Sequence, residues 1–308
     1  MKKLSKTKIG DNLFAFTLVL WPLIQFTVFW FYIRVGTIAS TFMKYDFSTN
    51  SYFFYGLRNY QSIFRKMILG EDIALHNAFW NSFQAIGINI VILPIAIFSA
   101  YAFYKKMPFH GFFNLMFYIP HLISVAVLTM IFTYMCKPEY GPLTLLLEKV
   151  FGLENVALLS VESDTLWPMI WIYCIWSGIG GNIIMMRSAM NKIPKEICES
   201  AILDGCGFFR ELWSITLPMC ISTIGVFFIM VAGAAPGFLM QPMLIVGGSG
   251  GQDGRFMTVA WFIFSNATNS SPSNIIAVTT IGLVFTLVNT PLIVGTRILV
   301  KKLTPDIA

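Results

Sequence analysis

Residues 187–217 read RSAMNKIPKEICESAILDGCGFFRELWSITL, a polar segment between two long apolar stretches. The segment predicts two short helices joined by a sharp turn, because Pro194 suits the start of a helix and Asp204-Gly205 suits its end. Apolar residues recur at helical spacing on both parts, at Ile197, Ala201 and Ile202 and then at Phe208, Leu212 and Ile215. Such an element can bind a partner protein, or it can lie among the lipid headgroups.

The composition of the whole chain is that of a membrane protein. Of its 308 residues, 56% are hydrophobic and only 12% are charged, whereas soluble domains carry roughly 25% charged residues. Lipid must therefore cover much of the surface. The net charge of +6 does not indicate nucleic-acid binding, because the basic residues are spread between apolar blocks. The five cysteines lack the spacing of a metal site and are interpreted as small apolar residues.

Six apolar blocks are each long enough to cross a bilayer, which takes about 20 predominantly apolar residues per helix. The sequence therefore predicts an all-α membrane protein with six transmembrane helices. We place the spans at residues 13–34, 78–104, 111–136, 165–190, 218–246 and 274–298. The first block is too long for the apolar core of a signal peptide, so we expect it to remain as an uncleaved span.

The basic residues predict the orientation of the chain. Six spans place both termini on one side, and Lys and Arg are more frequent in the connections on that side than on the other. Under the positive-inside rule, both termini and residues 187–217 are cytoplasmic. The predicted organisation is a cytoplasmic tail at residues 1–12, a transmembrane domain at 13–300 and a second cytoplasmic tail at 301–308.

The 187–217 segment also carries a sequence pattern with fixed spacing. Glu199-Ser200-Ala201, then Gly205, then Ile215-Thr216-Leu217-Pro218 resembles the EAA loop of the membrane subunits of binding-protein-dependent ABC importers, E-A-A-x3-G-x9-I-x-L-P. The spacing agrees throughout, and only Ser200 departs from the usual Ala. The preceding Ile193-Pro194-Lys195-Glu196 is similar to the I-P-x-E lead-in of this loop, and Asp204 precedes the glycine as in the sugar-type members.

The resemblance extends over nearly the whole chain. GLRNYQSIF at 56–64, AFWNS at 78–82 and IWSGIGGNIIMM at 175–186 are similar to segments of the sugar-importer permeases. The usual G-G-P after the fifth span is absent, since Ser249 follows Gly247-Gly248. The resemblance implies the type I ABC importer permease fold, like that of the maltose and glycerol-phosphate transporter subunits.

In that family the EAA loop is the helix that couples the permease to a cytoplasmic ATPase. The resemblance therefore implies that Glu199 contacts a basic group of the ATPase and that Gly205 makes the tight turn between the helices. The other residues that it implies in coupling are Pro194, Glu196, Ile197, Ser200, Ala201, Ile202, Leu203, Asp204, Ile215, Leu217 and Pro218.

The resemblance also implies the complex in which this chain works. We expect two ATPase subunits, a second and non-identical permease, and an extracytoplasmic solute-binding protein, all at the bacterial cytoplasmic membrane. The solute is expected to be sugar-like, of oligosaccharide type. The chain itself is expected to hold no catalytic group, cofactor or metal, with ATP and Mg²⁺ bound by the ATPase.

Aromatic and polar side chains within the spans are candidates for the solute path. Trp and Tyr can stack on sugar rings, but Trp near a helix end also anchors a span at the membrane surface. Amides within spans can face a cavity or simply bond to neighbouring helices. The candidates are Trp171, Tyr173, Trp176, Asn182, Gln241 and Asn289.

Two other classes of protein remain as alternatives. One is an ion- or proton-coupled secondary carrier without an ATPase, for which an intramembrane carboxylate would be expected but is scarce in these spans. The other is an intramembrane enzyme, which would need paired Asp, Ser-Lys or His-metal groups within the spans, and the sequence places none of these suitably. The chain also has no Walker motif, no H-E-x-x-H and no G-x-S-x-G.

Overall fold

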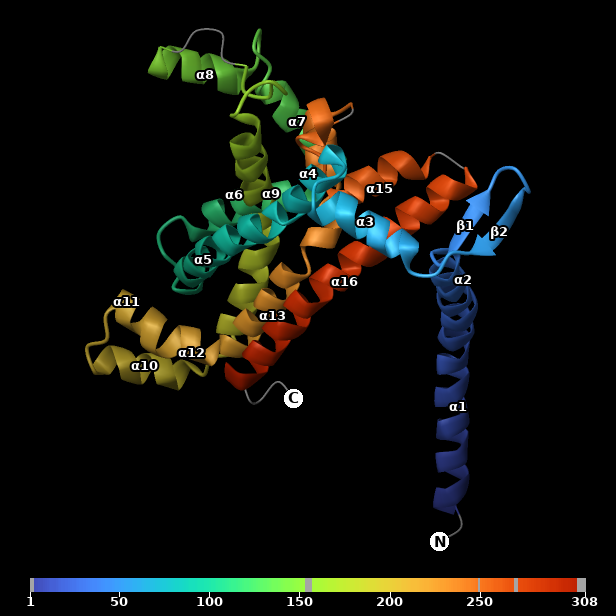
Figure 1. Ribbon diagram of the computed structural model, residues 1–308. Helices are drawn as coiled ribbons and strands as arrows, with labels where there is room; N and C mark the ends of the chain where they lie inside the picture. The colour runs from blue at the N-terminus through green and yellow to red at the C-terminus, as the bar shows by residue number, and fades with distance from the viewer. Residues whose placement is uncertain (1–2, 153–156, 249, 269–270, 304–308) are drawn as a thin grey trace. The chain divides into compact units, whose positions relative to one another are not determined.

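The computed structural model describes residues 3–152, 157–248, 250–268 and 271–303 (Figure 1). Residues 1–2 and 304–308 of the expected tails, and Ser249 after the fifth span, lie outside this part. The chain divides into two compact units, of which the first comprises Met1–Phe64 and Asn266–Ile281. The second comprises Arg65–Ser265 and Gly282–Ala308, and it contains residues 187–217 and all six candidate residues of the solute path.

The first unit holds a long apolar helix and a small hairpin. Helix α1 (Lys3–Gln25) continues through the π-helical Phe26–Tyr32 into α2 (Ile33–Ser40). Strands β1 (Met43–Asp46) and β2 (Ser51–Phe54) pair antiparallel. The expected all-α class is confirmed apart from this hairpin. Among the described residues, the apolar window within Phe14–Ser40 is 0% buried, as suits a helix in lipid.

The described residues contain four helical segments without a sharp bend that are long and apolar enough to cross a membrane. Two further spans are bent pairs of helices, so the total reaches six if each pair crosses once. The four are Phe14–Ser40, Ile73–Tyr104, Leu166–Met190 and Pro272–Leu303, and the pairs are His110–Leu122 with Val125–Met135, bent by 108°, and Phe208–Met219 with Ile221–Ala232, bent by 74°.

The bent pairs correct two of the expected spans. Residues 111–136 are not one helix, because Ile123 is extended between α6 (His110–Leu122) and α7 (Val125–Met135), and the Ser124 side chain accepts a hydrogen bond from the Val127 N–H at the start of α7. Apolar composition alone does not show such a break.

The expected span at 218–246 is also divided. It begins in α12 (Leu217–Met219) and continues in α13 (Ile221–Ala232), which ends well before residue 246. A 3-10 turn containing Pro236 follows, and only then does α14 (Met240–Val246) begin. Proline has no N–H to donate to a continuing helix, which agrees with the interruption.

The core of the second unit is the packing of α5 (Gln84–Tyr104) and α6 against α9 (Leu166–Met190). The helices approach closely where glycine leaves room. A Cβ on Gly87 of α5 would lie 2.8 Å from the Trp171 ring of α9, and one on Gly180 would lie 2.3 Å from the Phe117 carbonyl oxygen of α6. These contacts fix α5, α9 and α6 as one packed group.

The connections at the N-terminal end of α9 are held to that group by polar contacts. Asn81 of α4 (Ile73–Ser82) donates to the carbonyl oxygens of Arg255 and Met257, next to the short turn Gln252–Gly254. Arg255 also pairs with Asp164, just before α9. The remaining helices are α3 (Arg58–Ile68), α8 (Pro142–Phe151), α15 (Val259–Ala267) and α16 (Pro272–Leu303).

Candidate functional site

The C-terminal end of α9 leads into a turned-back pair of short helices, which we call the elbow (residues 194–218). It contains α10 (Lys195–Leu203), α11 (Phe208–Glu211), the π-helical Leu212–Thr216 and the start of α12 (Figure 1). Pro194 directly precedes α10, as the sequence predicted. The two expected short helices are therefore confirmed.

Gly205 makes the turn of the elbow. Its φ of +75° lies in the left-handed region, which side chains with a Cβ adopt at a cost. The turn is closed by hydrogen bonds from the Gly205 N–H to the Ile202 oxygen, at 3.0 Å, and from the Cys206 N–H to the Ala201 oxygen, at 2.9 Å. This is the usual way in which a helix ends at a glycine.

Helix α10 has two different faces. Cys198 and Ala201 are buried toward the bundle, whereas Ile202 is 59% and Leu203 88% exposed. Ala201, which the sequence groups with Ile197 and Ile202 by helical spacing, lies on the buried side together with Cys198, three residues before it. Exposed apolar groups of this size mark a surface that another protein or lipid covers.

The remaining residues that the resemblance implied in coupling divide in the same way between surface and bundle. In the part of the elbow that follows Gly205, Ile215 and Leu217 are half-buried, and Leu217 packs against the buried core. The other implied residues are exposed, and these are Pro194, Glu196, Ile197, Glu199, Ser200, Asp204, Gly205 and Pro218.

The elbow is attached to the end of α5 by aromatic side chains. The Tyr101 hydroxyl donates to the Phe208 carbonyl oxygen at 3.1 Å, and the two rings lie 4.6 Å apart. Phe98, one turn earlier on α5, stacks against Phe209 with 6.3 Å between ring centroids. The elbow is therefore a packed part of the bundle and not a free loop.

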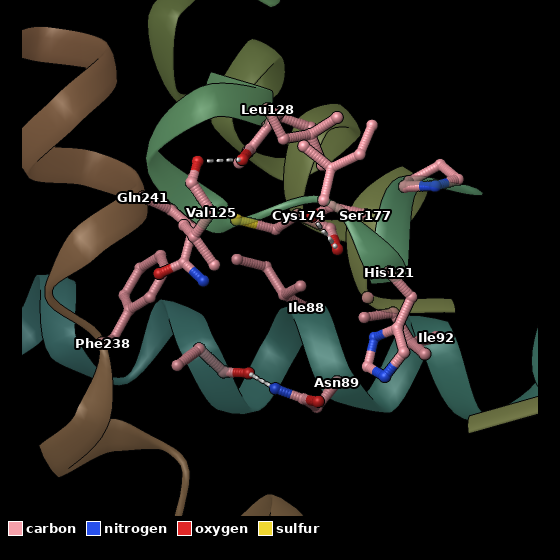
Figure 2. A pocket seen from close by; sticks show the side chains of 15 residues that line it. Ile88, Asn89, Ile92, His121, Val125, Leu128, Cys174, Ser177, Phe238 and Gln241 are labelled. Atoms are coloured by element: carbon pink, nitrogen blue, oxygen red, sulfur yellow. Dashed lines mark hydrogen bonds between the residues drawn. The ribbon is translucent and has the colours of Figure 1, made fainter. Parts of the chain in front are cut away.

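A cavity of about 260 Å³ lies within the bundle, bordered by α5, the α6–α7 break, α9 and α14 (Figure 2). It forms where two spans are interrupted, at 123–124 and at 233–239. Its lining is apolar with a few polar side chains, as in many sites for small molecules. The polar ones are Asn89, His121, Tyr173, Ser177 and Gln241.

The structure brings two of the expected path residues to this cavity, Tyr173 of α9 and Gln241 of α14. The Tyr173 hydroxyl lies 2.6 Å from the Thr129 hydroxyl and donates to the Val125 oxygen at 3.3 Å, so it is fixed against α7. Figure 2 shows the Gln241 side chain at the border of the cavity, across from Asn89 of α5. These residues approach from three different helices.

The other four expected path residues do not line the cavity. The Trp171 indole donates to Gln84 at 3.1 Å and packs over α5, and Trp176 is 38% exposed on another side of α9. Asn182 donates to the Gly178 oxygen of its own helix. Asn289 of α16 is buried, and neither of its amide atoms has a hydrogen-bond partner within the described part of the chain.

Three polar residues of the cavity, Asn89, Ser177 and His121, are absent from the candidates chosen from the sequence. Ser177 follows Tyr173 by four residues, so its place on the same face of α9 could have been read from helical spacing. The place of His121 could not be predicted, because it borders the cavity next to the break after α6. Hydropathy does not reveal that break.

His121 also borders a second cavity, of about 470 Å³, with Ser188, Lys192 and Thr223. A Cβ on Gly181 would lie 2.7 Å from the His121 ring, so the ring packs directly on α9 between the two cavities. One face of α9 thus lines both cavities, from Tyr173 to Lys192 beyond its end.

The polar groups of the first cavity are neutral amides and hydroxyls together with one imidazole. They can donate hydrogen bonds to a hydroxyl-rich solute and accept hydrogen bonds from it. Among the residues that the structure describes, no three His, Cys, Asp or Glu side chains are grouped as metal ligands. The arrangement is suited to binding and passage of a solute.

The chain is similar to known membrane components of transport systems. A sequence model of the family described as "Binding-protein-dependent transport system inner membrane component" matches residues 92–305, which include the elbow. The chain is 27% identical to the probable ABC transporter permease protein YurN of Bacillus subtilis over 290 residues, covering 91% of this chain and 94% of YurN.

Two further similarities concern proteins with named solutes. The multiple sugar-binding transport system permease protein MsmF of Streptococcus mutans is 23% identical over 254 residues, covering 78% of this chain and 80% of MsmF. One chain of a bacterial alginate ABC transporter, crystallised in complex with an alginate pentasaccharide-bound periplasmic protein, matches with a TM-score of 0.77 and 18% identity. The match covers 97% of both chains.

Proposed function

Because the chain belongs to the family of binding-protein-dependent transport system inner membrane components, we propose that it forms the translocation path of an ABC importer for an oligosaccharide-like solute. It is an integral membrane protein and a transport subunit with the type I permease fold. The sugar class is supported by the similarity to MsmF and by the hydrogen-bonding amides and hydroxyls of the cavity. The family membership lends no support to the alternative of a secondary carrier.

The observation that carries the proposal is the elbow. It combines an anchored inner face with an outer surface on which Leu203 and Ile202 are exposed beside the carboxylate of Glu199. A group of apolar side chains with charges at its rim is typical of a protein interface. We assign this surface to an ATPase subunit, with Glu199 contacting a basic group and with Pro194, Ile197 and Asp204 among its neighbours.

The proposed assembly contains two ATPase subunits, a second and non-identical permease, and an extracytoplasmic solute-binding protein. The cavity of about 260 Å³ is smaller than the roughly 300–1,000 Å³ of typical small-molecule sites, so a second permease would complete the path. ATP and Mg²⁺ would be bound by the ATPase. Dependence on a binding protein is part of the description of the family.

The proposed location is the bacterial cytoplasmic membrane, with both termini and the elbow in the cytoplasm. The excess of Lys and Arg on that side supports this orientation. Within the membrane, we assign solute contact to Tyr173 and Gln241, joined by Asn89, Ser177 and His121 around the cavity.

Reversal of one charge on the elbow tests the proposed function. Glu199→Lys should weaken binding of the ATPase subunits by roughly 30-fold or more, since unpairing an interfacial charge costs about 2 kcal/mol or more. The permease itself should still reach the membrane, because Glu199 is exposed. The measurement is the amount of ATPase that copurifies with the tagged permease.

Glu139→Lys is the matched control, since it reverses an exposed carboxylate outside the elbow, next to α7. It should leave ATPase copurification unchanged. If Glu199→Lys copurifies with as much ATPase as the unmodified chain and retains ATP-driven uptake, the elbow does not perform the proposed coupling.

A further inference from the structure

An ion pair joins the end of α5 to the elbow. Lys105, directly after α5, pairs with Glu211, the last residue of α11. The Glu211 side chain is 4% exposed and that of Lys105 is 22% exposed, so water has little access to the pair. A carboxylate in such a place is costly unless a cation stays beside it.

The burial of Glu211 separates it from the other acids of the elbow. Glu196, Glu199 and Asp204 are exposed and can contact a partner, whereas Glu211 faces inward. The Glu211 carboxylate therefore interacts with a group of this chain and not with a partner protein. Neither Lys105 nor Glu211 belongs to the EAA pattern that marks the loop.

Two tyrosines of α5 surround the same ammonium group. The Lys105 Nζ lies 5.9 Å from the ring centroid of Tyr101 and 5.8 Å from that of Tyr104, within the range of cation–π attraction. The Tyr101 hydroxyl donates to the Phe208 oxygen of α11, and the Tyr104 hydroxyl lies 3.5 Å from the Cys198 sulfur of α10. The end of α5 thus contacts both α10 and α11 of the elbow.

The same helix lines the cavity at its other end. Helix α5 is continuous from Gln84 to Tyr104, through Pro94, and its residues Ile88, Asn89 and Ile92 border the cavity. About 13 residues, or roughly 20 Å of helix, separate Ile92 from Lys105. A displacement of the elbow that also moves α5 therefore reaches the cavity wall.

We propose that Lys105 and Glu211 are positioning residues that clamp the elbow to α5, so that movement of the elbow by the ATPase changes the cavity. The inference rests on the proposed function, because it requires the elbow to be the ATPase contact. The Lys105–Glu211 pair thus connects movement of the cytoplasmic ATPase to the cavity within the membrane. The two tyrosines orient the Lys105 ammonium group. The Lys105–Glu211 ion pair then transmits movement of α11 to α5.

The test uses the assembled complex of both permeases and the ATPase in proteoliposomes. The variant Ser177→Cys places a cysteine at the cavity. The rate at which a small, charged thiol reagent labels this cysteine reports on access to the cavity, after the labelling rate of the parent chain has been subtracted. Mg-ATP with orthovanadate traps the ATPase and serves as the probe. With the clamp intact, trapping should change the labelling rate by roughly tenfold.

Lys105→Glu and Glu211→Lys should each abolish most of this response, leaving a change of roughly twofold or less. The double variant restores an opposite-charge pair and should recover more than half of the response on a logarithmic scale. Glu211→Gln, which keeps the shape of the side chain, guards against a failure to fold and should also reduce the response. Lys106→Glu, an exposed charge reversal at the next residue, should respond like the unmodified complex.

The clamp is contradicted if Glu211→Gln and the single reversals assemble with ATPase and respond fully to trapping. It is also contradicted if the variants lower only the yield of complex while each assembled complex responds normally. Glu199→Lys run in parallel separates the two proposals. If that variant keeps the ATPase and the full response, the proposed function fails; if it loses both while the clamp variants respond fully, only the clamp fails.

Discussion

Gly205 shows how one residue of the motif acts through backbone conformation. Its φ is +75°, and a Cβ built on it would meet no atom within 4 Å. The glycine is therefore required by the left-handed turn and not by lack of space. The sequence predicted this turn from Asp204-Gly205 after an amphipathic helix, and the structure confirms it.

Replacement of Gly205 should therefore disturb the elbow through strain alone. Gly205→Val is expected to cost about 1–2 kcal/mol locally, because β-branched residues strongly disfavour the left-handed region. Helix α10 should change direction relative to α11, and less ATPase should copurify with the permease.

Gly207→Val is the matched control for this prediction. Gly207 has a φ of −75°, so a side chain there needs no left-handed backbone, and an added Cβ meets no atom within 4 Å. Equal ATPase binding by the two variants would show that the left-handed turn is not needed for coupling.

At the same scale, the cavity residues were only partly predictable. Tyr173 and Gln241 were expected because polar and aromatic groups within spans are costly in lipid and so face a cavity or another helix. Trp171 was expected for the same reason but packs over Gly87. Burial in a bundle and exposure to a cavity give the same signal in a single sequence.

Among the elements, the unbroken helices followed from apolar length, and the broken ones did not. Hydropathy describes the surroundings of a segment, which remain apolar on both sides of the breaks at 123–124 and 233–239. The direction of the backbone depends instead on local groups such as Ser124, whose side chain caps α7. The cavity lies at these breaks, so its position could not be derived from span prediction.

The packing of α6 on α9 gives a prediction at the scale of elements. Gly180→Ala should destabilise the protein by about 1–3 kcal/mol, because the added Cβ would lie 2.3 Å from the Phe117 carbonyl oxygen and force the helices apart. The measurement is the thermal unfolding midpoint of the purified permease in detergent.

Gly111→Ala, on α6 itself, is the control, since an added Cβ there meets nothing within 4 Å. It should leave the midpoint unchanged or slightly higher, because alanine favours helix over glycine. An unchanged midpoint for Gly180→Ala would contradict the close approach of α6 and α9.

For the whole molecule, composition and one motif were sufficient to predict the class of fold. A chain that is 56% hydrophobic and 12% charged requires lipid, and the spacing from Glu199 to Pro218 identified the loop between the fourth and fifth spans. The hairpin of β1 and β2 was not expected, because its four-residue strands are too short to stand out by alternation.

The elbow and the cavity are both attached to α5 and α9, which is the physical basis of the proposed coupling. Helix α9 leads directly into the elbow and lines the cavity, and α5 contacts the elbow at Tyr101 and the cavity at Asn89. Movement of the elbow by a partner can therefore change the cavity without a flexible intermediate.

The most direct test of this account is cross-linking from the exposed tip of α10. Leu203, 88% exposed, is replaced by cysteine, and the complex is treated with a short bifunctional thiol–amine reagent in inside-out membrane vesicles. The account predicts a cross-link between the permease and the ATPase subunit that is lost in the Glu199→Lys background. The proposed coupling is contradicted if that cross-link is absent and the cysteine can be labelled only from the extracytoplasmic side of the membrane.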